Sequence, residues 1–257
     1  MKIAITGKGG VGKTTLSAIL SHLYAADGKK VIAVDADPDA NLAAALGVPA
    51  EALAKVRPLA EMTELIEERM GARPGKSGGV FKLNPRVDDI PEECGYRLNN
   101  ILLLVTGKSK EAASGCYCPE NVFLRRLLKH LVVDRNEIVI VDMEAGIEHL
   151  TRGTTEAVDA FIVVVEPGQR SIQTANTVKE MAKGLGVKKV FVVANKVRGQ
   201  DDLDFIKRLL PDAYLLGSIN FSHDIMESDI AGVTPFTIKG AVADVMKIKE
   251  ALERSTG

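Results

Sequence analysis

Residues 1–20 constrain the fold of this chain more than any other stretch. Residues 3–5 form an apolar run typical of a buried strand, and residues 16–23 carry apolar side chains at helical spacing. Between them, residues 7–14 read GKGGVGKT and satisfy the spacing G-x-x-x-x-G-K-[ST]. A strand, a glycine loop and a helix in this order predict a loop whose backbone amides bind phosphate at the start of the helix.

The same loop supplies two side chains suited to a nucleotide triphosphate. We expect Lys13 to reach the β- and γ-phosphates of ATP, and the Thr14 hydroxyl to ligate Mg²⁺. We expect the nucleotide, ATP or ADP, to be held here by Gly9, Gly10, Val11, Gly12, Lys13, Thr14 and Thr15.

A second lysine, Lys8, stands in the loop, where an ordinary phosphate loop needs only Lys13. In this the chain resembles the deviant Walker A group of ATPases, which includes MinD, ParA and the nitrogenase iron protein. The resemblance implies an ATP-dependent homodimer in which Lys8 acts in the partner's site. It also implies that Lys8 and Lys13 both take part in catalysis.

Acidic residues follow two further apolar strands. Residues 31–34 lead into Asp35 and Asp37, and residues 138–141 lead into Asp142. Ligands of parallel α/β sheets bind outside the carboxyl ends of the strands, so we expect these carboxylates beside the phosphate loop. Asp142 is expected to hold the Mg²⁺ shell, with Asp35 nearer that shell than Asp37.

Asp37 has two compatible interpretations. It is a candidate N-cap for a helix that begins at Pro38, runs to Leu46 and is closed by Gly47. The family resemblance implies a switch residue that orients the attacking water. In the second switch segment, the backbone amide of Gly146 is expected to sense the γ-phosphate.

The nucleotide base that the site prefers is predicted from the strand at residues 189–194, which ends in Asn195-Lys196-Val197-Arg198. A guanine site reads N-K-x-D, and Arg198 replaces the carboxylate that guanine needs, which favours ATP over GTP. The resemblance implies that Asn195 bonds adenine, and Lys196 is counted with it in the nucleotide site. Residues 220–222 are expected to close the base pocket.

The chain has three cysteines, too few for a disulfide framework. Cys116 and Cys118 form a C-x-C pair before a helix that begins at Pro119. Two thiolates do not complete a soft-metal site, but a homodimer would supply four, suited to Ni²⁺ or Zn²⁺. The alternative is two ordinary cysteines at a helix start. Cys94 by itself is interpreted as an ordinary cysteine.

Residues 142–154, DMEAGIEHLTRGT, together with the C-x-C pair, resemble the CooC family of nickel-insertion ATPases. That resemblance implies a dimer that binds Ni²⁺ or Zn²⁺ through Cys116 and Cys118 and serves carbon monoxide dehydrogenase. Acetyl-CoA synthase is an alternative client. Glu144 stands where relatives commonly carry Gly or Pro.

Two other classes of protein are weighed against this hypothesis. An iron–sulfur electron-transfer protein like the nitrogenase iron protein would need Cys94 to act with Cys118. A ParA-type DNA scaffold would need a basic surface, whereas 33 Lys and Arg against 34 Asp and Glu give a net charge of −1. The same balance argues against nucleic-acid and membrane partners.

The whole pattern predicts one doubly wound α/β domain over residues 1–257, with a mostly parallel sheet of about seven or eight strands. Residues 50–100 are expected to form a less regular insertion, with a helix over 59–70 and a short strand over 80–83. With no secretory signal before the first strand and no apolar run long enough to span a bilayer, we expect a cytoplasmic protein.

Overall fold

The computed structural model describes residues 1–37, 39–74, 80–107, 119–144, 158–187 and 189–256, and the statements below concern these residues. Its centre is an eight-stranded sheet in the order β3-β4-β2-β5-β1-β6-β7-β8. Every neighbouring pair is parallel except β3 and β4, which confirms the predicted doubly wound, mostly parallel sheet. The strands are β1 Lys2–Thr6, β2 Val31–Ala36, β3 Tyr96–Leu98, β4 Ile101–Val105, β5 Ile138–Met143, β6 Ala160–Val165, β7 Val190–Val197 and β8 Tyr214–Asn220.

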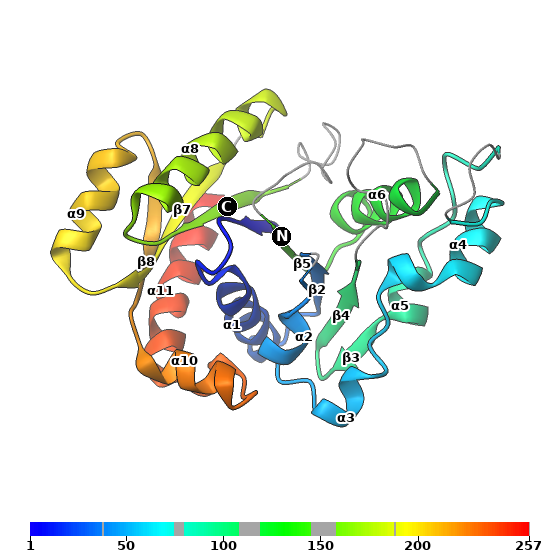
Figure 1. Ribbon diagram of the computed structural model, residues 1–257, viewed down its shortest axis with the longest axis horizontal. Coiled ribbons are helices and arrows are strands. Elements are labelled where there is room, and N and C mark those ends of the chain that lie inside the picture. The colour runs from blue at the N-terminus through cyan, green and yellow to red at the C-terminus, as the bar shows by residue number, and fades with distance from the viewer. Residues whose placement is uncertain (38, 75–79, 108–118, 145–157, 188, 257) are drawn as a thin grey trace.

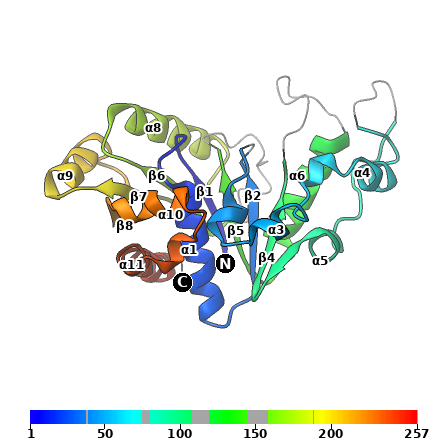
Figure 2. The same cartoon turned by 60° about the horizontal axis from the view of Figure 1, so that its bottom comes forward.

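Helices cover both faces of the sheet (Figures 1 and 2), with α1 and α11 on one face and α6 and α8 on the other. The α-helices are α1 Lys13–Ala26, α2 Leu42–Ala45, α3 Ala50–Leu53, α4 Thr63–Met70, α5 Ile90–Cys94, α6 Pro119–Val133, α8 Gln169–Gly184, α9 Gln200–Leu209, α10 His223–Ile230 and α11 Lys239–Thr256. Two 3₁₀ turns, Leu59–Glu61 and Pro235–Thr237, complete the described elements. None of the described helices is long and apolar enough to cross a membrane.

The strands divide the core into two layers because successive side chains point to opposite faces. In β1, Ile3 and Ile5 pack with α1 and α11, whereas Ala4 packs with the layer under α6 and α8. In β5, Val139 and Ile140 divide between the layers in the same way. Both faces are therefore apolar, which explains why the strands read as continuous hydrophobic runs.

The helix expected from Pro38 begins later, at Leu42, so the prediction of its start is wrong. Two carboxylates hold the preceding residues in turns: Asp35 accepts the Leu42 N–H at 2.8 Å, and Asp37 accepts the Asp39 N–H at 3.0 Å. These bonds satisfy the amides without a helix. The predicted end is confirmed, since Gly47 adopts φ 81° after α2.

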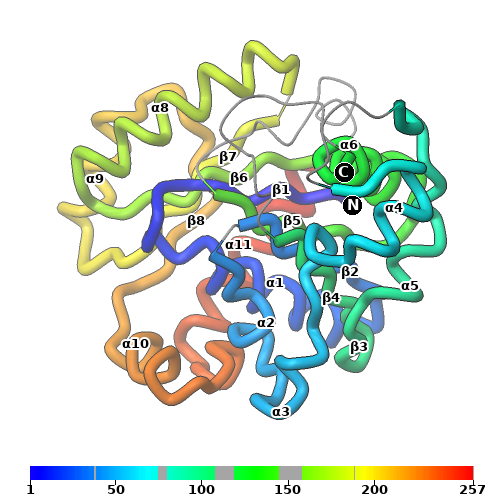
Figure 3. Tube along the Cα trace, turned by 45° about the vertical axis from the view of Figure 1, so that its right-hand side comes forward, coloured from blue at the N-terminus to red at the C-terminus, as the bar shows by residue number. Residues whose placement is uncertain are grey.

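Residues 50–74 and 80–98 lie at the end of the sheet formed by β3 and β4 (Figure 3). The helix expected over 59–70 is interrupted at Met62, so that a 3₁₀ turn precedes α4. The strand expected over 80–83 is absent. Lys82 donates its N–H to Met70 O at 2.8 Å, at the end of α4, and Val80 is 98% exposed. The edge of β4 is paired instead with β3.

Candidate nucleotide site

The phosphate loop connects β1 to α1 in the middle of the sheet, where β1 lies between β5 and β6. Gly7, Gly10 and Gly12 all have positive φ angles, of 148°, 79° and 94°. A Cβ on Gly12 would lie 2.1 Å from Asn195 Nδ2, and one on Gly7 would lie 2.4 Å from Val164 O. Glycine at both positions therefore lets β6 and β7 approach the loop.

Lys13 is buried at the start of α1, and its Nζ lies 3.6 Å from Asp37 Oδ2. The structure thus brings together two residues that the sequence places 24 positions apart. Lys8 is partly exposed on the same loop, and its carbonyl accepts the Val11 N–H at 3.3 Å. The predicted action of Lys8 in a partner's site stays a prediction.

Asp142 ends the apolar part of β5 and is fully buried, in register with Ile5 and Asp35. Among the residues that the structure describes, neither of its carboxylate oxygens has a partner in hydrogen-bond geometry. Burial raises the pKa of Asp142 to about 6, against the lowering effect of the nearby Thr14 hydroxyl. A buried, unsatisfied carboxylate beside a threonine hydroxyl is an oxygen donor set that suits Mg²⁺.

Asp35 is also fully buried, and its carboxylate accepts two backbone amides, from Leu42 at 2.8 Å and from Asp37 at 3.3 Å. Burial raises the pKa of Asp35 to about 7, although the bond from Leu42 pulls it down. Asp35 therefore fixes the turn that carries Asp37, in addition to lying beside Asp142 in the sheet.

The end of β7 touches the phosphate loop directly. Asn195 donates from Nδ2 to Val11 O at 2.7 Å, and Lys196 donates from Nζ to Gly10 O at 2.7 Å. The expected contact of Asn195 with adenine stays a prediction, because the contacts seen here are to the loop. Near this end, the Arg198 guanidinium lies 5.2 Å from the centre of the Phe221 ring. Phe221 belongs to the loop, residues 220–222, that is expected to close the base pocket.

Sequence reasoning missed two residues at the strand ends. Thr6 donates from its hydroxyl to Glu144 O at 2.6 Å, which joins β1 to the segment after β5. Glu166 lies 2.9 Å from Lys196 Nζ. A polar residue at the carboxyl end of a buried strand was the available signal for both, the same signal that identified Asp35 and Asp142.

Cys116, Cys118 and Gly146 lie outside the described residues. Cys94 is on α5, partly buried against the core, and burial raises the pKa of its thiol. Glu144 is exposed. Within the described ranges, no group of three or more His, Cys, Asp or Glu side chains is placed to hold a metal ion.

Comparison with known proteins agrees with this geometry. Residues 2–236 match the CobQ/CobB/MinD/ParA nucleotide binding domain. Over 244 residues the chain is 48% identical to the carbon monoxide dehydrogenase accessory protein CooC of Rhodospirillum rubrum, a match that covers 95% of this chain and 92% of that protein. The chain belongs to this nucleotide-binding family and is of the CooC type. It is also 46% identical to an ATP-binding protein of Methanocaldococcus jannaschii, over 90% of each chain.

Solved structures of other family members share the fold. The cell division ATPase MinD of Pyrococcus furiosus superposes with a TM-score of 0.68 at 22% identity, over 99% of both chains. MinD of Pyrococcus horikoshii, complexed with Mg-ADP, gives a TM-score of 0.68 at 19% identity, over 100% of this chain and 97% of that one. Together with the phosphate loop, family membership identifies this CooC-type chain as an ATPase.

Proposed function

We propose that this chain is a dimeric, cytoplasmic ATPase switch that binds nickel and assists its insertion into carbon monoxide dehydrogenase. The observation that most supports the proposal is the 48% identity to CooC across 95% of the chain. We treat residues 1–257 as one ATPase domain, with residues 50–100 inserted at the edge of its sheet.

In the proposed cycle, nucleotide binding begins by breaking an ion pair. Lys13 Nζ and Asp37 Oδ2 lie 3.6 Å apart, and phosphate oxygens would draw Lys13 away from that partner. Asp37 is then free to orient the attacking water. Because Asp35 fixes the turn around Asp37, this change passes to the start of α2.

Mg²⁺ would be held by Asp142 and Thr14, and when bound it neutralises charge on the β- and γ-phosphates. The two unsatisfied oxygens of Asp142 support this assignment. The backbone amides of the loop, Gly9 to Thr15, bind the phosphates, with Asn195 and Lys196 behind them. Lys8 of the partner subunit and the amide of Gly146 would complete the site only in the ATP-bound dimer.

Nickel is the cargo of this proposed switch. Cys116 and Cys118 from two subunits would supply four thiolates, and Cys118 directly precedes Pro119, the first residue of α6. A thiol at a helix N-terminus is more acidic, which favours the metal-binding form. Zn²⁺ is expected to occupy the same thiolates.

The test is equilibrium nickel binding with the mass of the complex measured in parallel, without nucleotide, with ADP and with a non-hydrolysable ATP analogue. We expect wild type to bind one Ni²⁺ per dimer and the variants Cys116→Ser and Cys118→Ser to bind none. Cys94→Ser is the matched control, because Cys94 is a partly buried thiol on another element. It should bind nickel as wild type does.

Three outcomes contradict the proposal. Nickel binding by Cys116→Ser and Cys118→Ser equal to wild type makes the pair structural and leaves an ATPase with another client. Visible absorbance that is lost in Cys94→Ser and Cys118→Ser but kept in Cys116→Ser indicates an iron–sulfur protein. Salt-sensitive DNA binding in the ATP state indicates a partitioning ATPase.

A further inference from the structure

Lys196 has an unusual backbone conformation at the end of β7. Its φ is 56°, and in the described part of the chain only Asn99 shares a positive φ among non-glycine residues. The register between β7 and β8 shifts between Ala194 and Val197 at the same place. A left-handed conformation is unfavourable for a lysine and persists where surrounding contacts hold it.

That conformation accompanies contact with a carbonyl of the phosphate loop. In a loop whose amides converge on an anion, the carbonyls of the same peptide units face away and need donors of their own. Lys196 Nζ donates to Gly10 O, and Asn195 Nδ2 donates to Val11 O, each at 2.7 Å. Two successive residues of β7 therefore satisfy two successive carbonyls of the loop.

A lysine ammonium holds a backbone carbonyl in place only when a second group fixes its position, because the lysine side chain is long and flexible. The Lys196 side chain is 43% exposed, so water competes for its charge. Glu166 Oε2 lies 2.9 Å from Nζ on the side of β6. The ammonium is thus fixed between a carbonyl of the loop and a carboxylate of the neighbouring strand end.

Glu166 is itself anchored. It directly follows β6, and its N–H donates to the Ser171 hydroxyl at 3.0 Å. Ser171 is buried in the first turn of α8. The carboxylate therefore starts from a backbone position that is fixed by the sheet and by α8, unlike most surface ion-pair partners.

We propose that Glu166 is a positioning residue for nucleotide binding. It holds Lys196 against the Gly10 carbonyl, so that the loop amides are aligned before the nucleotide arrives. Its effect is expected in the binding of the phosphates and not in the chemical step, since Glu166 acts through Lys196. The inference rests on the ATPase activity alone and does not depend on nickel.

The test measures the Kd of a fluorescent ADP analogue and the steady-state kcat and KM for ATP in Glu166→Gln, which keeps the shape and removes the charge. We expect the Kd and KM to rise about 5- to 20-fold, the loss typical of a charge-assisted contact, with kcat within about 2-fold of wild type. Lys196→Met should likewise raise Kd and KM and leave kcat within about 2-fold of wild type. The double variant should bind ADP no more weakly than either single variant, because both substitutions remove the same contact.

Asp27→Asn is the matched control. It breaks the Asp27–Lys249 ion pair, 2.7 Å long, which joins the end of α1 to α11. This variant should leave Kd, KM and kcat unchanged. Glu166→Asp, which keeps the charge on a shorter stem, should recover part of the affinity that Glu166→Gln loses.

The inference is overturned if Glu166→Gln binds ADP within 2-fold of wild type, if the two single losses add in the double variant, or if kcat falls at unchanged Kd. A thermal unfolding scan of each variant guards against misfolding. If Glu166→Gln does not fold, the comparison rests on Lys196→Met and Glu166→Asp. Nickel binding by Cys116→Ser tests the proposed function separately, so the two failures are distinguishable.

Discussion

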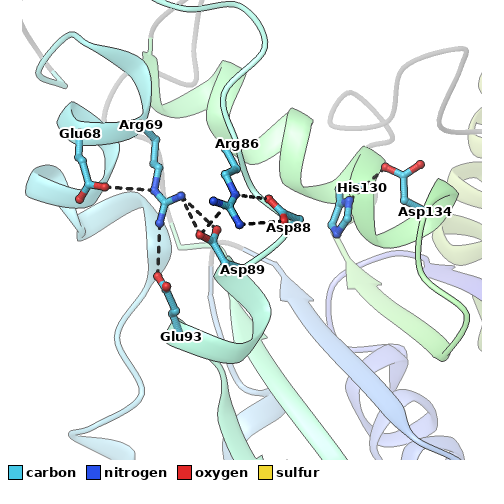
Figure 4. A network of polar contacts seen from close by, with 8 residues as sticks. All are labelled: Glu68, Arg69, Arg86, Asp88, Asp89, Glu93, His130 and Asp134. Carbon is cyan, nitrogen blue, oxygen red and sulfur yellow. Dashed lines mark hydrogen bonds and ion pairs between the residues drawn. The ribbon is translucent and has the colours of Figure 1, made fainter.

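Charged side chains have opposite environments in two regions of this molecule. Around the phosphate loop, burial raises the pKa of Asp35 to about 7 and that of Asp142 to about 6, so ionisation is disfavoured. At the β4 edge, each charge faces an opposite one (Figure 4). There the hydrogen bond to Asp89 raises the pKa of Arg69, and the bond from Arg86 lowers that of Asp88.

The difference separates an ion-pair network that holds elements together from a site that needs a ligand. Arg69 joins α4 to Asp89, just before α5, with two bonds of 2.9 and 3.1 Å, and its Nε lies 3.6 Å from the carboxylate of Glu68. In the described part of the chain neither oxygen of Asp142 has a hydrogen-bond partner, and a bound cation would balance its charge. Buried charges left unpaired by the fold are candidates for function, whereas paired charges at an edge chiefly stabilise it.

The largest effect is expected from removing the buried cation of the site. Lys13→Met keeps most of the apolar stem but deletes the charge that should bind the β- and γ-phosphates. We expect kcat/KM for ATP to fall at least about 100-fold, because a charged contact to the transferring phosphoryl group is lost. The measurement is steady-state ATP hydrolysis beside a thermal scan. Activity within 10-fold of wild type would remove Lys13 from the catalytic assignment.

Asp142→Asn should separate function from stability. Since the pKa of Asp142 is raised from near 3.8 to about 6, its stabilising contribution is present below pH 4 and is lost as the pH rises through 6. At pH 8 and without Mg²⁺ or nucleotide, the variant should therefore unfold at higher urea than wild type, while Mg²⁺-dependent ATP hydrolysis falls about 10- to 100-fold. A variant that is less stable at pH 8 contradicts this account.

How much of this contrast the sequence predicts differs between the two regions. The phosphate loop, Lys13 and Asp142 follow from a spacing rule and from the geometry of parallel strand ends, both of which are local. The pairing of Lys13 with Asp37 also follows once β1 and β2 are placed in one sheet. What did not follow was the start of α2, because the bond from Leu42 to Asp35 spans seven residues and depends on the fold.

The edge region was predicted less well for a physical reason. Three of residues 80–83 are apolar, but the edge of β4 is taken by β3, so tertiary context overrides their β propensity. The ion pairs of Arg69 reach residues 20 and 24 positions away, on α5 or just before it, and no periodicity in the sequence indicates such partners. Glu166 was missed for a similar reason, since its partner lies 30 positions away on another strand.

Asp35 is the second buried carboxyl group whose pKa is raised. The pKa of Asp35 is raised to about 7, so its contribution to stability falls between pH 4 and pH 7. Asp35→Asn lacks this ionisation and keeps an acceptor for the Leu42 N–H. Relative to wild type, the variant should gain about 2 kcal/mol between pH 5 and pH 8 in Mg²⁺-free unfolding experiments. Parallel pH profiles for the two proteins would contradict the raised pKa.

A smaller loss is expected at the centre of the edge network. Arg69 is 13% exposed, and Arg69→Met leaves Asp89 without its two strongest bonds. We expect a loss of about 1 kcal/mol in the free energy of unfolding, since the remaining carboxylates are within reach of water. ATP hydrolysis should stay within about 2-fold of wild type, because the network is separate from the phosphate loop. If ATPase activity falls by more than the loss of folded protein accounts for, the ion-pair network contributes to nucleotide hydrolysis and the two regions are coupled.

The smallest effect is expected at the rim of the same network. Arg86 is 69% exposed, and its ion pairs with Asp88 and Asp89 compete with water on every side. Arg86→Gln should shift the unfolding temperature by less than about 1 °C and leave ATP hydrolysis unchanged. Arg69→Met is the comparison, because both arginines face Asp89, Arg69 partly buried at 2.9 Å and Arg86 exposed at 3.8 Å. Equal losses from the two substitutions would show that pairing, and not burial, sets the strength of the edge network.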